Sequence, residues 1–290
     1  VADALTRTVQ REDCSGHSLL MSETSNSSRA AREKLLQLSF ETWGAQAFYL
    51  AHQSVLAMCA SARQTGLVIE CGESGCAAVP LYYGHVVPYA VTRNSVGGGD
   101  VTDHLAALLA AAGKSPPLPR EVVRAIKESP DIARVLPLPA ADDDKQGGGS
   151  GGGGGDQLEP ADFTLPDGMT LTISGADRAR IAEPLFAPAA LLGEAHRDER
   201  GLPELAAEAV LRCSDADARR ELLYNVVLAG GGSCFAGDLA ERVQAAMRRA
   251  MPGARIHVSA PVRLGLSLSR LLARGPVLRR SKASFCLAAR

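Results

Sequence analysis

Short apolar runs rich in β-branched residues alternate along this chain with longer segments in which apolar positions recur every three or four residues. The first pattern is typical of buried strands and the second of amphipathic helices. Strands are predicted at residues 47–51, 66–70 and 226–228, within 77–91, and as a hairpin at 165–175. Helices are predicted at residues 30–40, 53–63, 100–112 and 118–129, from about 204, and again from 238. Short strands mixed with helices indicate an α/β protein.

Two segments break these patterns. Residues 1–28 are polar and rich in serine, so we expect them to be loop or disordered, with order beginning near Ser18. Residues 140–157 combine acidic side chains with a glycine run that cannot form a core, and we expect a flexible, dispensable surface insertion. This insertion is consistent with a domain boundary and equally with a fold that continues across it. Trp43 and Phe48, by contrast, have apolar neighbours and are predicted core residues.

Three glycines, Gly230 to Gly232, follow the predicted strand at 226–228 and precede a predicted helix. Open α/β sheets place ligands at the carboxyl ends of their strands, although glycine clusters there are also common as plain turns. The sequence is neither G-x-G-x-x-G nor a Walker loop, so the pattern alone leaves both interpretations open.

Composition narrows the class of protein. The 290 residues are 46% hydrophobic, enough for one large or two ordinary domains, and the formal net charge is −1. This charge gives no general footprint for nucleic acid or an anionic membrane. No stretch has the length of a transmembrane segment, and the first residues do not resemble a secretory leader, so we expect a soluble intracellular protein.

Cysteine usage agrees with a reducing compartment. The seven cysteines are scattered and mostly lie in apolar runs, which favours reduced, buried thiols over a disulfide framework. Cys71 and Cys76 have no histidine nearby, so zinc binding is not expected.

Several separate stretches resemble, in the same order, segments of actins and actin-related proteins. They cover about residues 18–262 apart from the insertion, and they are AREKLLQLSFETWGAQAFYLAHQSVLAMCASARQTGLVIECGESG, VPLYYGHVVPYAV, GGGDVTDHLAALL, REVVRAIKE, LPDGMTLTISG, LFAPAALLG and NVVLAGGGSCFAGDL. The resemblance implies the actin-like fold of the ribonuclease H-like class, shared with Hsp70-type ATPases. In that fold two α/β domains close around ATP and a divalent cation.

The resemblance also implies a domain plan. Residues 1–17 would be a disordered segment, 18–60 part of the first actin-like domain, and 61–266 a largely complete second domain interrupted at 140–157. Residues 267–290 form a divergent basic tail, which we interpret as solvated, with a partner- or membrane-binding helix as the alternative.

On the adenosine side of the nucleotide, the matched positions keep the family's residue types. The resemblance assigns nucleotide binding to Gly98, Arg124, Lys127, Glu128, Gly230, Gly231 and Phe235. Lys127 would pack beside the adenine and Glu128 would accept hydrogen bonds from the ribose. Arg124, Lys127 and Glu128 are spaced so that all three can project from one helical face. Glycine at 230 and 231 would let the backbone approach the nucleotide.

On the phosphate side the matched loop is altered. Actins have two aspartates in a D-x-G-D-G pattern, whereas this chain has Glu70, Gly72, Glu73 and Ser74. The resemblance implies that Glu70 acts on Mg²⁺ or Ca²⁺ through water and that Gly72, Glu73 and Ser74 lie at the phosphates. Each glutamate is one methylene longer, which can displace a ligand. An ordinary hairpin turn is the other interpretation of this loop.

Hydrolysis in actins uses a glutamine and a histidine to position water. Gln53 matches the glutamine, but Ala77 stands at the histidine position, and His52 is interpreted as a packed or surface residue. No stretch before residue 18 resembles the first phosphate hairpin, D-x-G-S/T-G, or the small subdomain that follows it. We therefore expect ATP or ADP to bind weakly or not at all and hydrolysis to be negligible.

These features predict an actin-related structural or scaffolding protein of a cytoskeletal or larger assembly, with a degenerate adenine-nucleotide site. The expected partners are proteins, either actin-like or subunits of a complex, without direct contact to nucleic acid. The expected location is the cytoplasm and cytoskeleton, with the nucleus as the alternative. Two other functions stay open: a competent filament-forming actin-type ATPase, and a nuclear actin-related subunit of a chromatin-remodelling complex.

Overall fold

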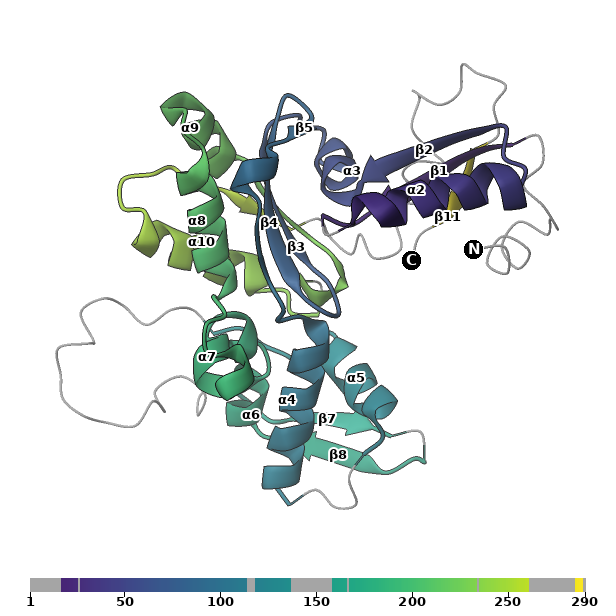
Figure 1. Ribbon diagram of the computed structural model, residues 1–290. Helices are drawn as coiled ribbons and strands as arrows, with labels where there is room; N and C mark the ends of the chain where they lie inside the picture. The colour runs from purple at the N-terminus through teal and green to yellow at the C-terminus, as the bar shows by residue number, and fades with distance from the viewer. Residues whose placement is uncertain are drawn as a thin grey trace. The chain divides into compact units, whose positions relative to one another are not determined.

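The computed structural model describes residues 17–25, 27–113, 118–136, 158–165, 167–233 and 235–260, together with the backbone of 285–288 (Figure 1). The predicted insertion, most of the basic tail and the first sixteen residues therefore lie outside the described residues. The chain divides into two compact units, one formed by residues 1–63 and 266–290 and the other by residues 64–265. In the described part, no helix is both long and apolar enough to cross a membrane.

The first unit contains a parallel three-stranded sheet in the order β11-β1-β2. Its elements are β1 (Ser18–Glu23), α2 (Arg29–Gln37), a π-helix (Leu38–Thr42), β2 (Ala47–His52), α3 (Gln53–Ala60) and β11 (Phe285–Ala288). Strand β1 begins at Ser18, where order was expected to begin, but no strand was predicted there because the alternating run SLLMSE is too short to stand out from its serine-rich surroundings. Strand β11 takes four residues of the tail that was interpreted as solvated or helical.

The described buried apolar residues of the first unit include Met21, Ala51, Ala57 and Met58 besides one cluster around Leu19. Leu19 and Ala45 are buried, while Trp43 and Phe48 pack against them only half-buried. The prediction that both aromatics are core residues was therefore too strong. Helix α2 has no buried residue, and Phe40 is 48% exposed, although its segment was predicted as an amphipathic helix.

The second unit is built on a mixed sheet in the order β10-β9-β3-β4-β5, with β6 also pairing with β4. These strands are β3 (Gly66–Cys71), β4 (Cys76–Tyr82), β5 (His85–Val86), β6 (Thr92–Asn94), β9 (Val226–Ala229) and β10 (Val258–Ser259). Every residue of β3 is buried, as expected for a central strand covered on both faces. Strand β3 runs antiparallel to β4 and parallel to β9.

Helices cover this sheet and form the rest of the unit. The helices are α4 (Gly98–Ala111), α5 (Arg120–Glu128), α6 (Gly175–Arg180), α7 (Pro188–Leu191), α8 (Leu202–Arg212), α9 (Ala216–Tyr224) and α10 (Leu239–Ala250), with 3-10 turns at Pro88–Ala90, Glu183–Leu185, Glu194–His196 and Gly231–Ser233. Helices α8, α9 and α10 lie beside β3 and β4, whereas α4 and α5 gather with the hairpin β7 (Ala161–Thr164) and β8 (Thr170–Ile173) beyond one end of the sheet (Figure 1). The sequence predicted this hairpin, but it missed α6 and α7.

One buried arginine holds both chain segments that border the insertion. Arg178, on α6 and only 7% exposed, donates hydrogen bonds from its guanidinium to the carbonyls of Asp131, Ile132 and Glu159. Leu136 and Leu158 also line one common depression. The two described ends of the chain on either side of residues 137–157 are therefore fixed close together.

Candidate functional site

The glycine-rich turns of the second unit meet at the carboxyl end of β3. The turn that joins β3 to β4 closes with a hydrogen bond of 2.9 Å from the Gly72 amide to the Gly75 carbonyl. The first amides of α4 then bind this turn: Gly98 donates to the Gly72 carbonyl at 2.8 Å and Gly99 to the Glu73 carbonyl at 2.7 Å. The predicted phosphate loop is thus a hairpin turn fastened to a helix N-terminus.

The glycine run after β9 has two different structural roles. Gly230 has φ +94°, and a Cβ there would lie 2.3 Å from the Cys71 carbonyl oxygen, so the fold itself requires glycine. A Cβ on Gly232 would lie 2.7 Å from Cys71 Sγ. A Cβ on Gly231 would meet nothing within 4 Å. The sequence argument gave one reason, approach to a ligand, for Gly230 and Gly231, and only Gly231 has open space beside it.

Lys127 is a buried lysine at the centre of the predicted adenosine side. Its side chain is 3% exposed, and its ammonium donates to the Gly98 carbonyl at 2.7 Å and to Thr102 Oγ1 at 2.8 Å. Burial lowers the pKa of Lys127, while the nearby Glu73 and Glu128 carboxylates oppose that shift. Lys127 therefore ties α5 to the first turn of α4.

Phe235, from the segment between β9 and α10, lies next to Lys127. The Phe235 ring is buried, and Lys127 Nζ lies 5.9 Å from its centroid, at the outer limit of a cation–π contact. Lys127 thus contacts Gly98 on one side and lies near Phe235 on the other, while the nucleotide-binding role of these residues stays a prediction.

Arg124 and Glu128 are half-exposed and bind each other, with Arg124 Nε 2.8 Å from Glu128 Oε1. This pair raises the pKa of Arg124. Because Lys127 is buried against α4, the three predicted residues of α5 do not project together from one exposed face. Glu128 would have to exchange its arginine partner for a ribose hydroxyl.

Glu73 and Ser74 are exposed at the tip of the turn. Glu73 lies 3.7 Å from Arg120 Nη1, which the sequence argument did not identify. Arg120 also binds Asp103, with an Nε to Oδ1 distance of 2.9 Å. An arginine at the start of a helix carries no distinctive sequence signal, so only the fold could reveal this contact.

Glu70 and Ala77 are opposite each other on the antiparallel strands β3 and β4, and both are buried. Directly opposed side chains on such strands lie on the same face. The predicted cation-associated carboxylate and the position where actins have histidine are therefore neighbours. Within the described residues, no group of three or more His, Cys, Asp or Glu side chains is arranged to hold a metal ion, and the water-mediated role of Glu70 stays a prediction.

Gln53 belongs to the first unit, where it is the first residue of α3. The preceding residue, His52, caps that helix by accepting a hydrogen bond at Nδ1 from the Ser54 amide at 3.3 Å. This capping role was not predicted, since His52 was interpreted only as a packed or surface residue.

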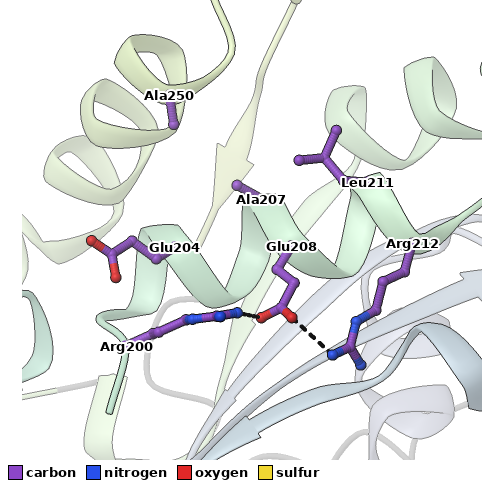
Figure 2. Close-up of a pocket in the computed structure, with 7 residues that line it drawn as sticks. All are labelled: Arg200, Glu204, Ala207, Glu208, Leu211, Arg212 and Ala250. Carbon is purple, nitrogen blue, oxygen red and sulfur yellow. Dashed lines mark hydrogen bonds and ion pairs between the residues drawn. The ribbon is translucent and has the colours of Figure 1, made fainter. Parts of the chain in front are cut away.

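A separate depression of about 500 Å³ lies along α8 and contains none of the predicted site residues (Figure 2). Glu208 accepts hydrogen bonds there from Arg200 and, at 2.8 Å, from Arg212. Arg212 also donates to the Val91 carbonyl at 3.3 Å. These contacts join the segment before α8 and the segment before β6 to the helix, which is a structural role.

Comparisons with known proteins identify the same relationship as the resemblance. The family model described as Actin matches residues 3–118 and 115–265. A curated protein named "Actin-like protein" from Neurospora crassa is 34% identical over 247 residues, which are 84% of this chain and 62% of that relative. The chain thus matches less than two thirds of the length of the relative.

Proposed function

Since this chain belongs to the actin family, we propose that it is an actin-related structural or scaffolding protein with a degenerate adenine-nucleotide site. Its partners would be proteins, actin-like or other subunits of a cytoskeletal or larger assembly, and its place would be the cytoplasm and cytoskeleton. We expect no efficient ATP hydrolysis.

The buried cluster of Lys127, Gly98 and Phe235 supports retention of an adenosine site. Contacts of Lys127 with the Gly98 carbonyl and near the Phe235 ring fix the positions of these side chains. The space beside Gly231 is open, and Gly231 belongs to the glycine run that the family uses to bind adenosine. In the proposal, adenine packs beside Lys127 and the ribose hydroxyls bind Glu128.

The Glu70–Ala77 pair carries the proposal that the phosphate side is degenerate. A methyl group stands beside the buried carboxylate where the family has an imidazole, so water on this strand pair lacks a second polar group to orient it. A divalent cation, when bound, neutralises phosphate charge, and Glu70 would hold it through water. In addition, the Gly98 and Gly99 amides already bind the turn and are not free to bind phosphate.

Calorimetry with Mg-ATP, followed by a phosphate-release assay, tests the proposal on the 290-residue chain. We expect binding weaker than micromolar and negligible turnover. Submicromolar binding together with turnover comparable to filament-forming actins would instead support the alternative, a competent actin-type ATPase.

Gly231→Ala tests whether adenosine binds where the family would place it. A methyl group at 231 meets no protein atom, so we expect unchanged thermal stability and at least a several-fold weaker Kd for a fluorescent adenine nucleotide. Gly237→Ala is the matched control, because a Cβ at 237 also meets nothing within 4 Å. Equal affinity of the two variants would contradict the proposed adenosine position.

A nuclear actin-related subunit of a chromatin-remodelling complex would belong to the same family and have the same nucleotide site as the proposed scaffolding protein. Affinity purification followed by mass spectrometry distinguishes these two functions. Recovery of cytoskeletal proteins supports the proposal, and recovery of chromatin-remodelling subunits overturns it.

A further inference from the structure

Cys71 and Cys76 form a close pair of buried thiols at the base of the Gly72–Gly75 turn. They are directly opposite each other in the register of β3 and β4, and their sulfur atoms are 3.0 Å apart. Cys71 is 0% exposed and Cys76 is 4% exposed. Both are free thiols.

The backbone at this pair has the geometry that a cross-strand disulfide needs. Gly72 and Gly75 form the hydrogen-bonded pair that closes the turn, and the Cys76 amide donates away from β3, to Asn94 Oδ1 at 3.0 Å. Cys71 and Cys76 therefore occupy the next, non-hydrogen-bonded pair, in which Cα atoms lie about 4.5 Å apart. A disulfide accepts Cα separations from about 4.4 to 6.8 Å, so the spacing typical of such a pair lies within the range that the bond accepts.

We propose that Cys71 and Cys76 are a reversible oxidation site, converted by hydrogen peroxide into a disulfide that locks the turn between them. The turn contains Glu73 and Ser74, and its carbonyls hold the first amides of α4. Cys71 Sγ also lies against Gly232, since a Cβ on that glycine would be 2.7 Å from the sulfur. The site therefore lies where the two glycine-rich turns and α4 meet.

The chemistry balances with peroxide as the only oxidant. The Cys71 sulfur attacks a peroxide oxygen, an S–O bond forms as the O–O bond breaks, and the leaving hydroxide takes the thiol proton to become water. Cys76 Sγ then attacks the Cys71 sulfenic acid, the S–S bond forms, and the second oxygen leaves as water with the Cys76 proton. The two thiols lose two electrons and the peroxide gains them.

Cys71 is the attacking sulfur because Cys76 is the hydrogen-bond donor of the pair. The hydrogen bond to Cys71 and burial raise the pKa of Cys76 well above its usual range, which keeps that thiol protonated. Because both sulfurs are buried, we expect their oxidation to be slower than that of the exposed Cys59.

Peptide mapping of the intact chain tests the proposal without any nucleotide. Trypsin cuts after Arg63 and Arg93, and the peptide between them contains Cys71 and Cys76 as its only cysteines and no other Lys or Arg. The folded protein is treated with peroxide, and the remaining thiols are alkylated in denaturant. We expect the peptide to lack two hydrogens and both alkyl groups, and dithiothreitol before alkylation should restore both.

Two variants make the assignment specific. In Cys71→Ser the Cys76 thiol should stay open to alkylation after peroxide. Cys213→Ser is the matched control, because Cys213 is equally buried but its sulfur contacts the Ala209 carbonyl, and it should keep the cross-link. A peptide that still carries two alkyl groups after peroxide treatment far longer than that needed to oxidise Cys59 would overturn the proposal.

Hydrogen exchange tests the locking effect separately. The amides of residues 72–75 should exchange several-fold more slowly in the oxidised protein than in the reduced protein, while the amides of α8 should not change. Equal exchange at the turn in both states would show that the disulfide does not restrain it.

Discussion

Lys127 is the residue whose environment differs most from that of an ordinary surface lysine. Its ammonium is buried, satisfied by the Gly98 carbonyl and Thr102, and close to an aromatic ring. A buried cation of this kind is stable only while those partners are present. The stability of the α4–α5 contact therefore depends on the protonation and partners of one side chain.

Replacing Lys127 with Met should reduce stability by about 1–3 kcal/mol at neutral pH, since the Gly98 carbonyl and Thr102 lose a donor. Because the folded pKa of Lys127 is lowered below 10.5, the unfolded chain binds more protons just below that pH. The advantage of the wild type over the variant should therefore grow as pH rises toward 10.5. Urea unfolding at several pH values measures this trend.

Lys34→Met, at an exposed lysine of α2, provides the control. It should change stability little and show no such trend with pH. If the stability difference between the wild type and Lys127→Met does not grow as pH rises, the pKa of Lys127 is not lowered in the folded protein.

Gly230→Ala should destabilise the second unit by about 2 kcal/mol or more, because a side chain there combines a positive φ with a backbone collision. Gly231→Ala should leave stability within about 0.5 kcal/mol of the wild type. Thermal unfolding of the two variants side by side measures the contrast. Similar melting temperatures would show that the turn adapts more freely than its contacts imply.

At the scale of the elements, α8 is held in place by charged side chains as well as by its buried face. The Arg200–Glu208–Arg212 cluster joins the helix to the segments before α8 and β6 (Figure 2). Glu208 is one quarter exposed at its side chain, less than either arginine. A partly shielded carboxylate with two guanidinium partners is worth more than a fully exposed ion pair.

Glu208→Gln should cost about 0.5–1.5 kcal/mol at pH 7. The hydrogen bond from Arg200 lowers the pKa of Glu208 below 4.5, so its contribution is present above that pH and disappears as pH falls through the folded value. Denaturant unfolding at pH 7 and at acid pH measures both. Glu204→Gln, on the same helix and exposed, is the control and should have a smaller effect.

Elements were predictable from sequence where a single local pattern determined them. The run GLVIE and the Gly-containing hairpin at 165–175 predicted β3 and the β7–β8 turn because burial and turn chemistry are both local. Strand β1 could not be predicted, since its stability comes from pairing with β2 and β11. The same holds for the candidate site. The glycines and the charged residues of α5 could be identified from the sequence, but the contacts of Lys127, Arg120 and Cys71 could not, because they involve residues distant in sequence.

At the scale of the whole molecule, the two units differ in how much core they contain. The second unit has a continuous buried cluster that runs through β3, α4, α8 and α10, whereas the first unit has fewer buried apolar residues among those described: Leu19, Met21, Ala45, Ala51, Ala57 and Met58. Local stability follows buried apolar contacts. From the described residues we therefore expect higher local stability in the second unit than in the first.

Hydrogen exchange of the intact chain should show this difference directly. The amides of α2, a helix with no buried residue, should exchange at least tenfold faster than those of β3, all of whose residues are buried. Exchange at equal rates would mean that the units unfold together. Addition of a partner that covers α2 should slow its exchange alone.

Arg178 donates hydrogen bonds to the carbonyls of Asp131, Ile132 and Glu159. These bonds affect how the chain can change in length. Because one guanidinium fixes both flanks, the polypeptide between them can grow or shrink without altering where it leaves and re-enters the fold. Each doubling of such a loop adds only about 0.6 kcal/mol of closure entropy. We therefore expect the fold to accept a fluorescent reporter inserted between these two flanks, so that the chain could be imaged in cells.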